Sequence, residues 1–372
     1  MNCIIRIIVR IATGLLFAFS GFVKIVDPIG SEIKFGEYFE AFGMHVLVPG
    51  SLAFGVLLAV AELVTGLCLL FGLRMKLASL ASVAFIGFFT ALTFVLALTD
   101  AVKDCGCFGD AVKLTNWQTF YKNLIILPFT VYMFVERRKY KTFMSCRAEL
   151  SVVGLFLLAS VGISTYCYRH LPLIDFIAYK AGANIPKEMS IPEGAPEDVY
   201  AEGTYIYEKN GRKQTFTLDN LPDSTWVFVD APPPKLLKKG YVPKIQDFSI
   251  SSSEGLIHDK IFERGGYVIF VTSENISKMN TGKSALLNEL YEFSTKSGIN
   301  FMMLTASQDD AADYAAKAGA AYPIFFTDAT ALKSMVRSNP GMMLLKDNVV
   351  LKKWHYNDFP SVEELRNALE IN

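Results

Sequence analysis

Five long apolar stretches in the first half of the chain constrain its fold more than any other feature. They cover about residues 4–25, 51–73, 77–99, 118–135 and 149–167 of the 372. A helix of roughly 20 mostly apolar residues is long enough to cross the hydrocarbon core of a bilayer. The pattern therefore predicts a bundle of transmembrane helices in a lipid bilayer, followed by a soluble domain. The first stretch runs on into GFVKIVDP without a small-residue cleavage site, so we expect it to be retained rather than removed as a signal peptide.

Charge and cysteine usage narrow the classes of function. The chain has 36 Lys and Arg against 36 Asp and Glu, and this balance gives no reason to expect a nucleic-acid partner. All the cysteines lie in the apolar half, so the soluble half is not a disulfide-stapled domain. They are Cys3, Cys68, Cys105, Cys107, Cys146 and Cys167.

Basic residues in the short loops predict the orientation, because Lys and Arg are retained on the cytoplasmic side. They lie at the start of the first stretch, as Arg6 and Arg10, and they gather after the second and after the fourth. These segments are therefore predicted to be cytoplasmic, with the loops around 26–50 and 100–117 outside. Five spans would also place the N-terminus inside and the C-terminal domain outside. Cys105, Cys107 and Cys167 would then face the outer side, away from the reducing cytoplasm.

Cys105 and Cys107 stand out in the outer loop KDCGCFGDAVKLTN. A fully extended Cys-Gly-Cys would hold its Cα atoms near 7 Å apart, at the limit for a disulfide, but Gly106 allows a tighter turn. Exposed and strained disulfides are the reactive ones, so this pair is a candidate redox centre. The alternative is a static brace, although bridging so short a loop removes little chain entropy.

The surroundings of the pair leave its chemistry open. The loop has no His and only Cys167 offers a third sulfur, so we expect no metal site. Lys103 and Lys113 favour a thiolate, whereas Asp104 and Asp110 oppose it. Cys167 is a candidate relay for electrons or for resolving a mixed disulfide. The more ordinary interpretation is a buried apolar cysteine at a helix end.

Two ionisable residues fall within the predicted spans. Glu62 lies in the middle of the second span and should face the bundle interior with a partner. It is a candidate proton relay or quinone ligand, or else a residue that specifies packing. Lys24 lies at the outer end of the first span, where snorkelling to the interface would explain it, although it is also a candidate partner of Glu62, as is Arg10. Hydrogen-bond candidates are Thr65, Thr90 and Thr93.

Residues 1–140 resemble the DoxX-like superfamily and, within it, the MauE (methylamine utilisation protein) family. The similarity rests on GLLFAFSGFVKIVDP, AELVTGLCLLFGL and the loop DCGCFGD. It implies a four-helix core with a fifth helix appended, in a bacterial inner membrane. MauE-type proteins are associated with disulfide formation in a periplasmic partner enzyme, so the resemblance implies that Cys105 and Cys107 are the redox pair and Glu62 a family position.

The soluble half begins with a linker and a β-hairpin. NIPKEMSIPEGAPED should be extended, and TYIYEKNGRKQTFTL predicts two strands around the turn Asn210-Gly211. From about 241, YVIFVTS and FMMLTAS are typical of buried parallel strands with a helix between them. PIFFTD, a helix near 329–337, two strands and a last helix capped by Ser361 follow. We therefore expect an α/β domain over residues 241–372. Before it we expect a four-helix membrane domain over 1–147, a fifth transmembrane helix over 148–170, and a linker with the β-hairpin over 171–240.

This order of elements resembles the thioredoxin fold, in its TlpA and peroxiredoxin branch. Pro340 in SNPGMMLLKD stands where that family has its cis-proline, and it is a candidate loop for binding an extended peptide or simply a residue that shapes the hairpin. Where an active thioredoxin carries Cys-x-x-Cys, this chain has Glu274, Asn275 and Ile276. The domain is therefore expected to lack thiol exchange of its own. Ser273 and His355 have no triad context.

Two functions from different classes fit these patterns. The first is a membrane thiol–disulfide oxidoreductase, or a redox accessory factor, in which Cys105 and Cys107 exchange with an extracytoplasmic client protein. Its electrons would pass to a membrane quinone, the candidate cofactor, or to another protein, an expectation taken from similar membrane oxidoreductases. The second is a non-enzymatic scaffold or assembly factor with a structural Cys-Gly-Cys disulfide. A small-molecule carrier is weaker, because the spans show no paired repeats or broken helices.

Overall fold

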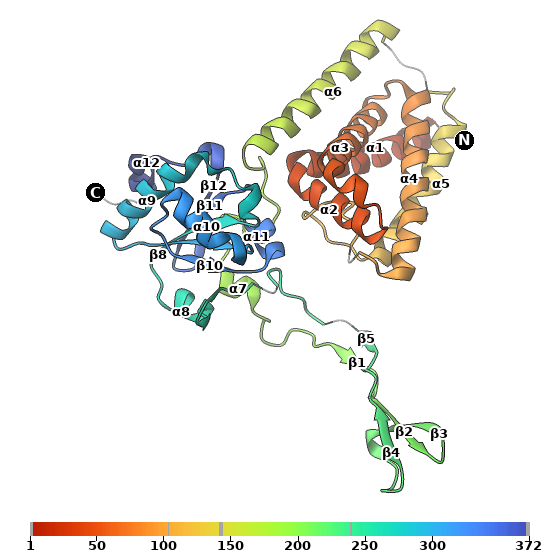
Figure 1. The fold of residues 1–372 in the computed structure, drawn as a ribbon. Helices are drawn as coiled ribbons and strands as arrows, with labels where there is room; N and C mark the ends of the chain where they lie inside the picture. The colour runs from red at the N-terminus through yellow and green to blue at the C-terminus, as the bar shows by residue number, and fades with distance from the viewer. Residues whose placement is uncertain (1–2, 103, 141–143, 239, 247, 370–372) are drawn as a thin grey trace.

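The protein was analysed as a computed structural model, which describes residues 3–102, 104–140, 144–238, 240–246 and 248–369. It consists of a helical half and an α/β half joined by one long helix (Figure 1). Lys103, one of the two lysines considered near the cysteine pair, lies outside the described residues.

Long helices form over all five apolar stretches of the first half. They are α1 (Cys3–Val26), α3 (Ser51–Phe71), α4 (Met75–Thr99), α5 (Asn116–Val135) and α6 (Cys146–Arg169). Within the described residues, four segments are long and apolar enough to cross a membrane, namely Ile4–Val26, His45–Phe71, Met75–Thr99 and Cys146–Arg169. The chain is therefore a membrane protein.

The prediction of a fifth span over 118–135 is not met by the same measure. The helix α5 forms there and packs along α4, but its hydropathy is too low to qualify. The reason is its polar content, since Asn116, Gln118, Lys122 and Asn123 all lie in the first half of the helix. Buried positions such as Asn123 show that part of this polar surface faces the bundle. The orientation inferred from five spans thus remains a prediction.

The predicted outer loop around 26–50 is mostly helical. It contains α2 (Pro28–Ala41) and the 3₁₀ helix η1 (His45–Gly50). Asp27 is the N-cap of α2, accepting a hydrogen bond of 2.8 Å from the Gly30 backbone N–H, and Pro28 occupies the first turn, where its missing N–H costs nothing. Together these residues turn the chain sharply from α1 into α2.

Small residues let α1 and α3 pack at close range. A Cβ atom on Gly66 would lie 2.3 Å from the backbone nitrogen of Ala18, and one on Gly21 would lie 2.3 Å from that of Leu63. Such close approach is typical of glycine-containing helix pairs in membranes. It also brings polar side chains of α1 and α3 within reach of each other.

The α/β half is built on a seven-stranded sheet with strand order β12-β11-β8-β9-β10-β6-β7. Its strands are β6 (Ser251–Ser252), β7 (Gly255–Leu256), β8 (Tyr267–Ser273), β9 (Asn300–Thr305), β10 (Ile324–Phe326), β11 (Gly341–Lys346) and β12 (Val349–His355). Strands β8, β9 and β10 are parallel, as predicted for the first two, and β11 and β12 form the predicted antiparallel hairpin. The result is a thioredoxin-like domain.

Both faces of this sheet are covered, which explains why its strands are continuously apolar. Ile269 and Val271 point to one core and Val268 and Phe270 to the other, as strand alternation requires. The first core is closed by α9 (Ser284–Lys296), α10 (Gln308–Ala318) and α12 (Val362–Ala368), and the second by α11 (Ala329–Met335), α7 (Ile185–Met189) and α8 (His258–Glu263).

The predicted cap of the last helix is present, because Ser361 and Glu364 form a capping box. Short 3₁₀ helices are η2 (Leu218–Asn220), η3 (Ile276–Lys278), η4 (Thr281–Lys283) and η5 (Tyr356–Asp358).

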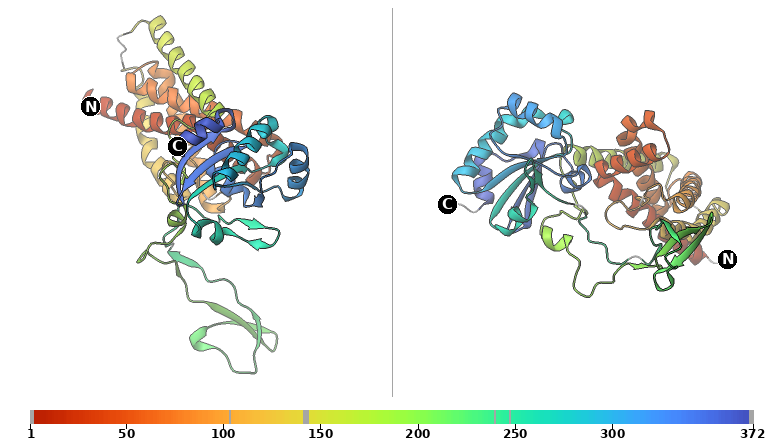
Figure 2. Two further views of the ribbon diagram at one scale, coloured as in Figure 1. Left: turned by 90° about the vertical axis from the view of Figure 1, so that its left-hand side faces the viewer. Right: turned by 60° about the horizontal axis from the view of Figure 1, so that its bottom comes forward.

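A narrow arm projects from the α/β domain (Figures 1 and 2). The strands β1 (Val199–Tyr200) and β5 (Leu236–Lys238) form its stem. Its tip is a three-stranded sheet, in the order β3-β2-β4, of β2 (Thr204–Lys209), β3 (Arg212–Thr217) and β4 (Val227–Asp230). The predicted hairpin turn is present at Asn210 and Gly211, both with positive φ as that turn requires.

Candidate functional site

The Cys-Gly-Cys loop follows α4 and is closed by a disulfide between Cys105 and Cys107, with their Cα atoms 5.5 Å apart. Gly106 has φ +60° and Gly109 φ +50°, conformations that favour glycine, and the Gly109 N–H donates to the Gly106 carbonyl at 3.0 Å. The tight turn expected from the sequence is thus provided by these glycines. Cys105 is 5% exposed, whereas Cys107 is only half-buried. The two bonded cysteines therefore differ in burial.

The membrane helices hold this loop by its backbone. The Tyr38 hydroxyl, on α2, donates a hydrogen bond of 2.6 Å to the carbonyl of Cys105. The Ser20 hydroxyl, on α1, donates one of 2.7 Å to the carbonyl of Cys107. Each cysteine is thus fixed by a different helix. Asp104 is held by Lys34 of α2 at 3.2 Å; burial lowers the pKa of Lys34, but Asp104 and Glu37 outweigh it and raise the pKa overall.

A buried polar network lies beneath the loop. Lys24 Nζ is 2.5 Å from Glu62 Oε2 and 2.9 Å from the Ser20 hydroxyl, and Ser20 also lies 3.4 Å from Glu62. All three side chains are buried. Because Ser20 contacts Cys107, this network connects a carboxylate inside the bundle to the redox candidate. Lys122 of α5 adds a second cation, 4.4 Å from the Phe108 ring centroid.

These contacts decide between the partners considered for Glu62. Thr90 and Thr93 donate to carbonyls of their own helix, at Ile86 and Phe89. Lys24 is instead the ion-pair partner, with 9% of its surface exposed. Snorkelling of Lys24 to the interface is therefore wrong, because a carboxylate within reach holds its ammonium group inside the bundle.

Cys167, unlike Cys105 and Cys107, is not part of a disulfide. It is a free thiol near the end of α6 and is only 1% exposed. A relay needs a thiolate that can reach the partner disulfide, and burial at this level hinders attack. Its relay role stays a prediction. Within the described residues, no group of three or more His, Cys, Asp or Glu is placed to hold a metal ion.

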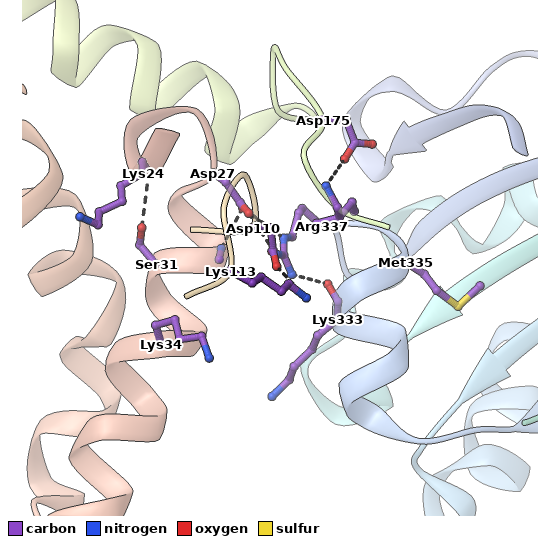
Figure 3. Close-up of polar contacts among 12 residues, drawn as sticks. Lys24, Asp27, Ser31, Lys34, Asp110, Lys113, Asp175, Lys333, Met335 and Arg337 are labelled. Atoms are coloured by element: carbon purple, nitrogen blue, oxygen red, sulfur yellow. Dashed lines mark hydrogen bonds and ion pairs between the residues drawn. The ribbon is translucent and has the colours of Figure 1, made fainter. Parts of the chain in front are cut away.

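The thioredoxin-like domain faces the redox loop with the segment before its cis-proline. The Asn339–Pro340 bond is cis, and Arg337 precedes it by three residues. Arg337 is 4% exposed and reaches into the membrane half, where its NH2 group lies 2.9 Å from Asp27 and 2.7 Å from Asp110 (Figure 3). Sequence patterns alone did not single out Arg337, because its partners are 227 and 310 residues away in the chain.

The position of the missing thioredoxin cysteines is filled by a hydrogen-bonded loop. The Ser273 hydroxyl donates a hydrogen bond of 2.7 Å to the side-chain oxygen of Asn339. The side-chain amide nitrogen of Asn339 donates one of 2.9 Å to the Asn275 carbonyl. Burial raises the pKa of Glu32 on α2, and the charge of Glu274 raises it further. This face of the domain is therefore occupied by contacts within the chain.

Comparison with known proteins agrees with this architecture. Residues 2–136 match the family model of the methylamine utilisation protein MauE. Residues 201–233, in the arm, match a domain of unknown function. Protein TlpB of Flavobacterium psychrophilum is 26% identical over 176 residues, which cover 46% of this chain and 45% of that protein. The chain thus spans less than half the length of this relative. No solved structure gives a significant match.

These findings define the class to which the protein belongs. It is a multi-helix membrane protein whose helices carry a soluble α/β domain. More particularly, it consists of a MauE-like membrane domain followed by a thioredoxin-like domain.

Proposed function

We propose that this protein is a membrane thiol–disulfide redox protein that acts on an extracytoplasmic client through Cys105 and Cys107. The observation that carries the proposal is the unequal burial of the two bonded cysteines, with Cys107 partly exposed and Cys105 buried. Disulfide exchange needs one sulfur that a partner can attack and a second that leaves as a thiolate. The match of residues 2–136 to the MauE family supports the same interpretation.

The reaction follows from this asymmetry. A client thiolate attacks Cys107, the Cys105–Cys107 bond breaks, and Cys105 leaves as a thiolate. A second client thiol then attacks the client sulfur of the mixed disulfide, which releases Cys107 and leaves the client oxidised. Two electrons have passed to the cysteine pair. A membrane quinone is the acceptor we propose, which would take up these electrons and two protons and restore the disulfide.

The polar network has a defined role in this scheme. Lys24 is a cation within hydrogen-bond reach of Ser20, which holds the Cys107 carbonyl. Positive charge near a cysteine favours its thiolate, and an acid–base pair in the bundle offers a place for protons during reoxidation. We therefore assign Ser20, Lys24 and Glu62 to support of the redox pair.

The orientation that we propose is a cytoplasmic N-terminus and a periplasmic soluble domain. An alkaline-phosphatase fusion at residue 200 should then be active, and an inactive fusion would reverse the orientation.

Trapping of thiols in intact cells tests the function. Cys105→Ser leaves a lone Cys107 thiol, whose thiolate can attack a client that is already in its disulfide form, releasing one client thiolate. Because Cys105 is no longer there to resolve the mixed disulfide, a reducible, covalent adduct with the client should accumulate. Cys107→Ser leaves the buried sulfur and should accumulate much less. Cys146→Ser, at an exposed free cysteine, is the matched control and should behave as wild type. A wild-type disulfide that stays fully oxidised, with no adduct in either variant, would instead identify a structural brace in a scaffold protein.

A further inference from the structure

The two acidic residues that flank the cysteine pair are both neutralised, but by different parts of the chain. Asp104 is paired with Lys34 of the membrane half. Asp110 is paired with Arg337 of the thioredoxin-like domain, at 2.7 Å, as well as with Lys113 at 3.5 Å. Since Lys113 is 65% exposed, its pairing with Asp110 is screened by solvent. Arg337 is therefore the fixed cation on this side of the loop.

All three guanidinium nitrogens of Arg337 make hydrogen bonds at this contact. Its Nε atom lies 3.1 Å from both carboxylate oxygens of Asp27, and NH2 bridges Asp27 and Asp110. NH1 donates to the carbonyl of Lys333 at 2.6 Å, which ties the group to α11 (Figure 3). Burial lowers the pKa of Arg337, but the two carboxylates outweigh it, so the pKa is raised overall. Asp27 is itself fixed as the N-cap of α2.

The docked domain is held at a second point, near the end of α6. Asp358 lies 2.7 Å from Nδ1 of His170, and the Asn357 side chain donates to the Arg169 carbonyl at 2.7 Å. Lys353 pairs with Asp175 in the segment that follows α6. These contacts fix the domain relative to the helix that carries it, so Arg337 approaches the redox loop from a fixed direction.

We infer that the thioredoxin-like domain is a non-catalytic docking domain for the redox loop of its own chain, and that Arg337 is the positioning residue that holds Asp110 beside the cysteine pair. This inference rests on the proposed redox function of Cys105 and Cys107. It gives the domain a role that needs no cysteines of its own. The face next to the cis-proline, where an active thioredoxin would exchange disulfides, is used instead to bind the loop that does.

The inference has an electrostatic consequence. Without Arg337, Asp110 keeps a negative charge near Cys107, and among the described residues the cation still paired with it is the exposed Lys113. Such a charge disfavours the thiolate, and hence the reduced form, so the disulfide becomes harder to reduce. Arg337→Gln should shift the equilibrium with glutathione toward the disulfide by about 3- to 10-fold. Arg337→Lys, which keeps the charge, should recover most of this shift, and adding Asp110→Asn to Arg337→Gln should remove it.

Docking is measured separately, in full-length protein in lipid nanodiscs. Cysteines are introduced as Glu32→Cys on α2 and Glu274→Cys on the soluble domain, with Cys3, Cys68, Cys146 and Cys167 replaced by Ser and Cys105–Cys107 kept oxidised. A short bis-maleimide should cross-link the two engineered sites. Pairing Glu32→Cys with Glu363→Cys, on α12 far from the bundle, is the control and should not cross-link. Arg337→Gln should lower the yield at least fivefold, whereas Arg212→Gln in the arm should not change it.

The results separate the parts of the inference. The docking role would be overturned if the Glu32→Cys and Glu274→Cys sites did not cross-link in protein that keeps Arg337. It would also be overturned if Arg337→Gln left the cross-linking yield unchanged. Loss of the cross-link with no change in the glutathione equilibrium would overturn the positioning role. Far-UV circular dichroism of each variant shows whether it has folded, and Arg337→Lys provides a second test if Arg337→Gln does not fold. Neither measurement needs a client, so failure to trap an adduct with Cys105→Ser would count against the proposed function alone.

Discussion

Lys24 and Glu62 form an ion pair of 2.5 Å between the helices α1 and α3, in the interior of the membrane half. Both side chains are at most 10% exposed. Taking one charge away from such a pair leaves the other buried and uncompensated, which is costly, whereas removing both is tolerated better. The ion pair thus contributes to the stability of the bundle and, through Ser20, is connected to the Cys107 carbonyl.

The first prediction concerns this pair. Glu62→Gln or Lys24→Met alone should lower the free energy of unfolding by about 3–5 kcal/mol, because each leaves a lone charge in the bundle. The double variant should lose less than either single variant. Thermal unfolding in detergent measures the difference. Additive losses in the double variant would show that the two charges do not interact.

A second prediction concerns the contact of α1 with α3. Gly66→Ala should destabilise the bundle by about 1–3 kcal/mol, because the new methyl group would lie 2.3 Å from the Ala18 backbone and force the helices apart. Gly87→Ala, on α4, is the matched control. Its Cβ would meet nothing within 4 Å, so it should be neutral or slightly stabilising. Equal melting temperatures for the two variants would argue against tight packing of α1 on α3.

A third prediction concerns acid stability of the soluble domain. Burial lowers the pKa of His355 to about 4, with Asp358 opposing this shift and His170 adding to it. Between about pH 6.5 and pH 4 the unfolded chain therefore binds more protons at this site than the folded chain, and stability falls as the pH falls. The loss should be about 1–3 kcal/mol over this window.

The substitution His355→Asn isolates that contribution. Its side-chain oxygen can still accept the hydrogen bond that Nδ1 of His355 receives from the Asn357 N–H at 3.2 Å. Chemical denaturation of both proteins at pH 7 and pH 4 gives the comparison. The variant should lose less stability on acidification than wild type. The same loss in both proteins would assign the acid sensitivity to other groups.

Much of the fold could be predicted from local patterns. Apolar runs located the helices α1, α3, α4 and α6, and alternating or continuous apolar segments located β2, β3, β8 and β9. The cis-proline and the capped last helix were also correctly placed. These features depend on residues close together in sequence, which is why periodicity and turn residues indicate them. The helix α2 was missed, because charged residues interrupt its apolar positions.

What the sequence by itself determined was the composition of the site: two cysteines around a glycine in one loop, an acid in the second apolar stretch, and a soluble domain without the thioredoxin cysteines. Tertiary structure alone decided which cysteine is the more buried, that Lys24 pairs with Glu62, and that Arg337 reaches Asp27 and Asp110. The physical reason is range. A turn is set by neighbours in the chain, whereas an ion pair between residues 310 positions apart depends on how whole domains pack.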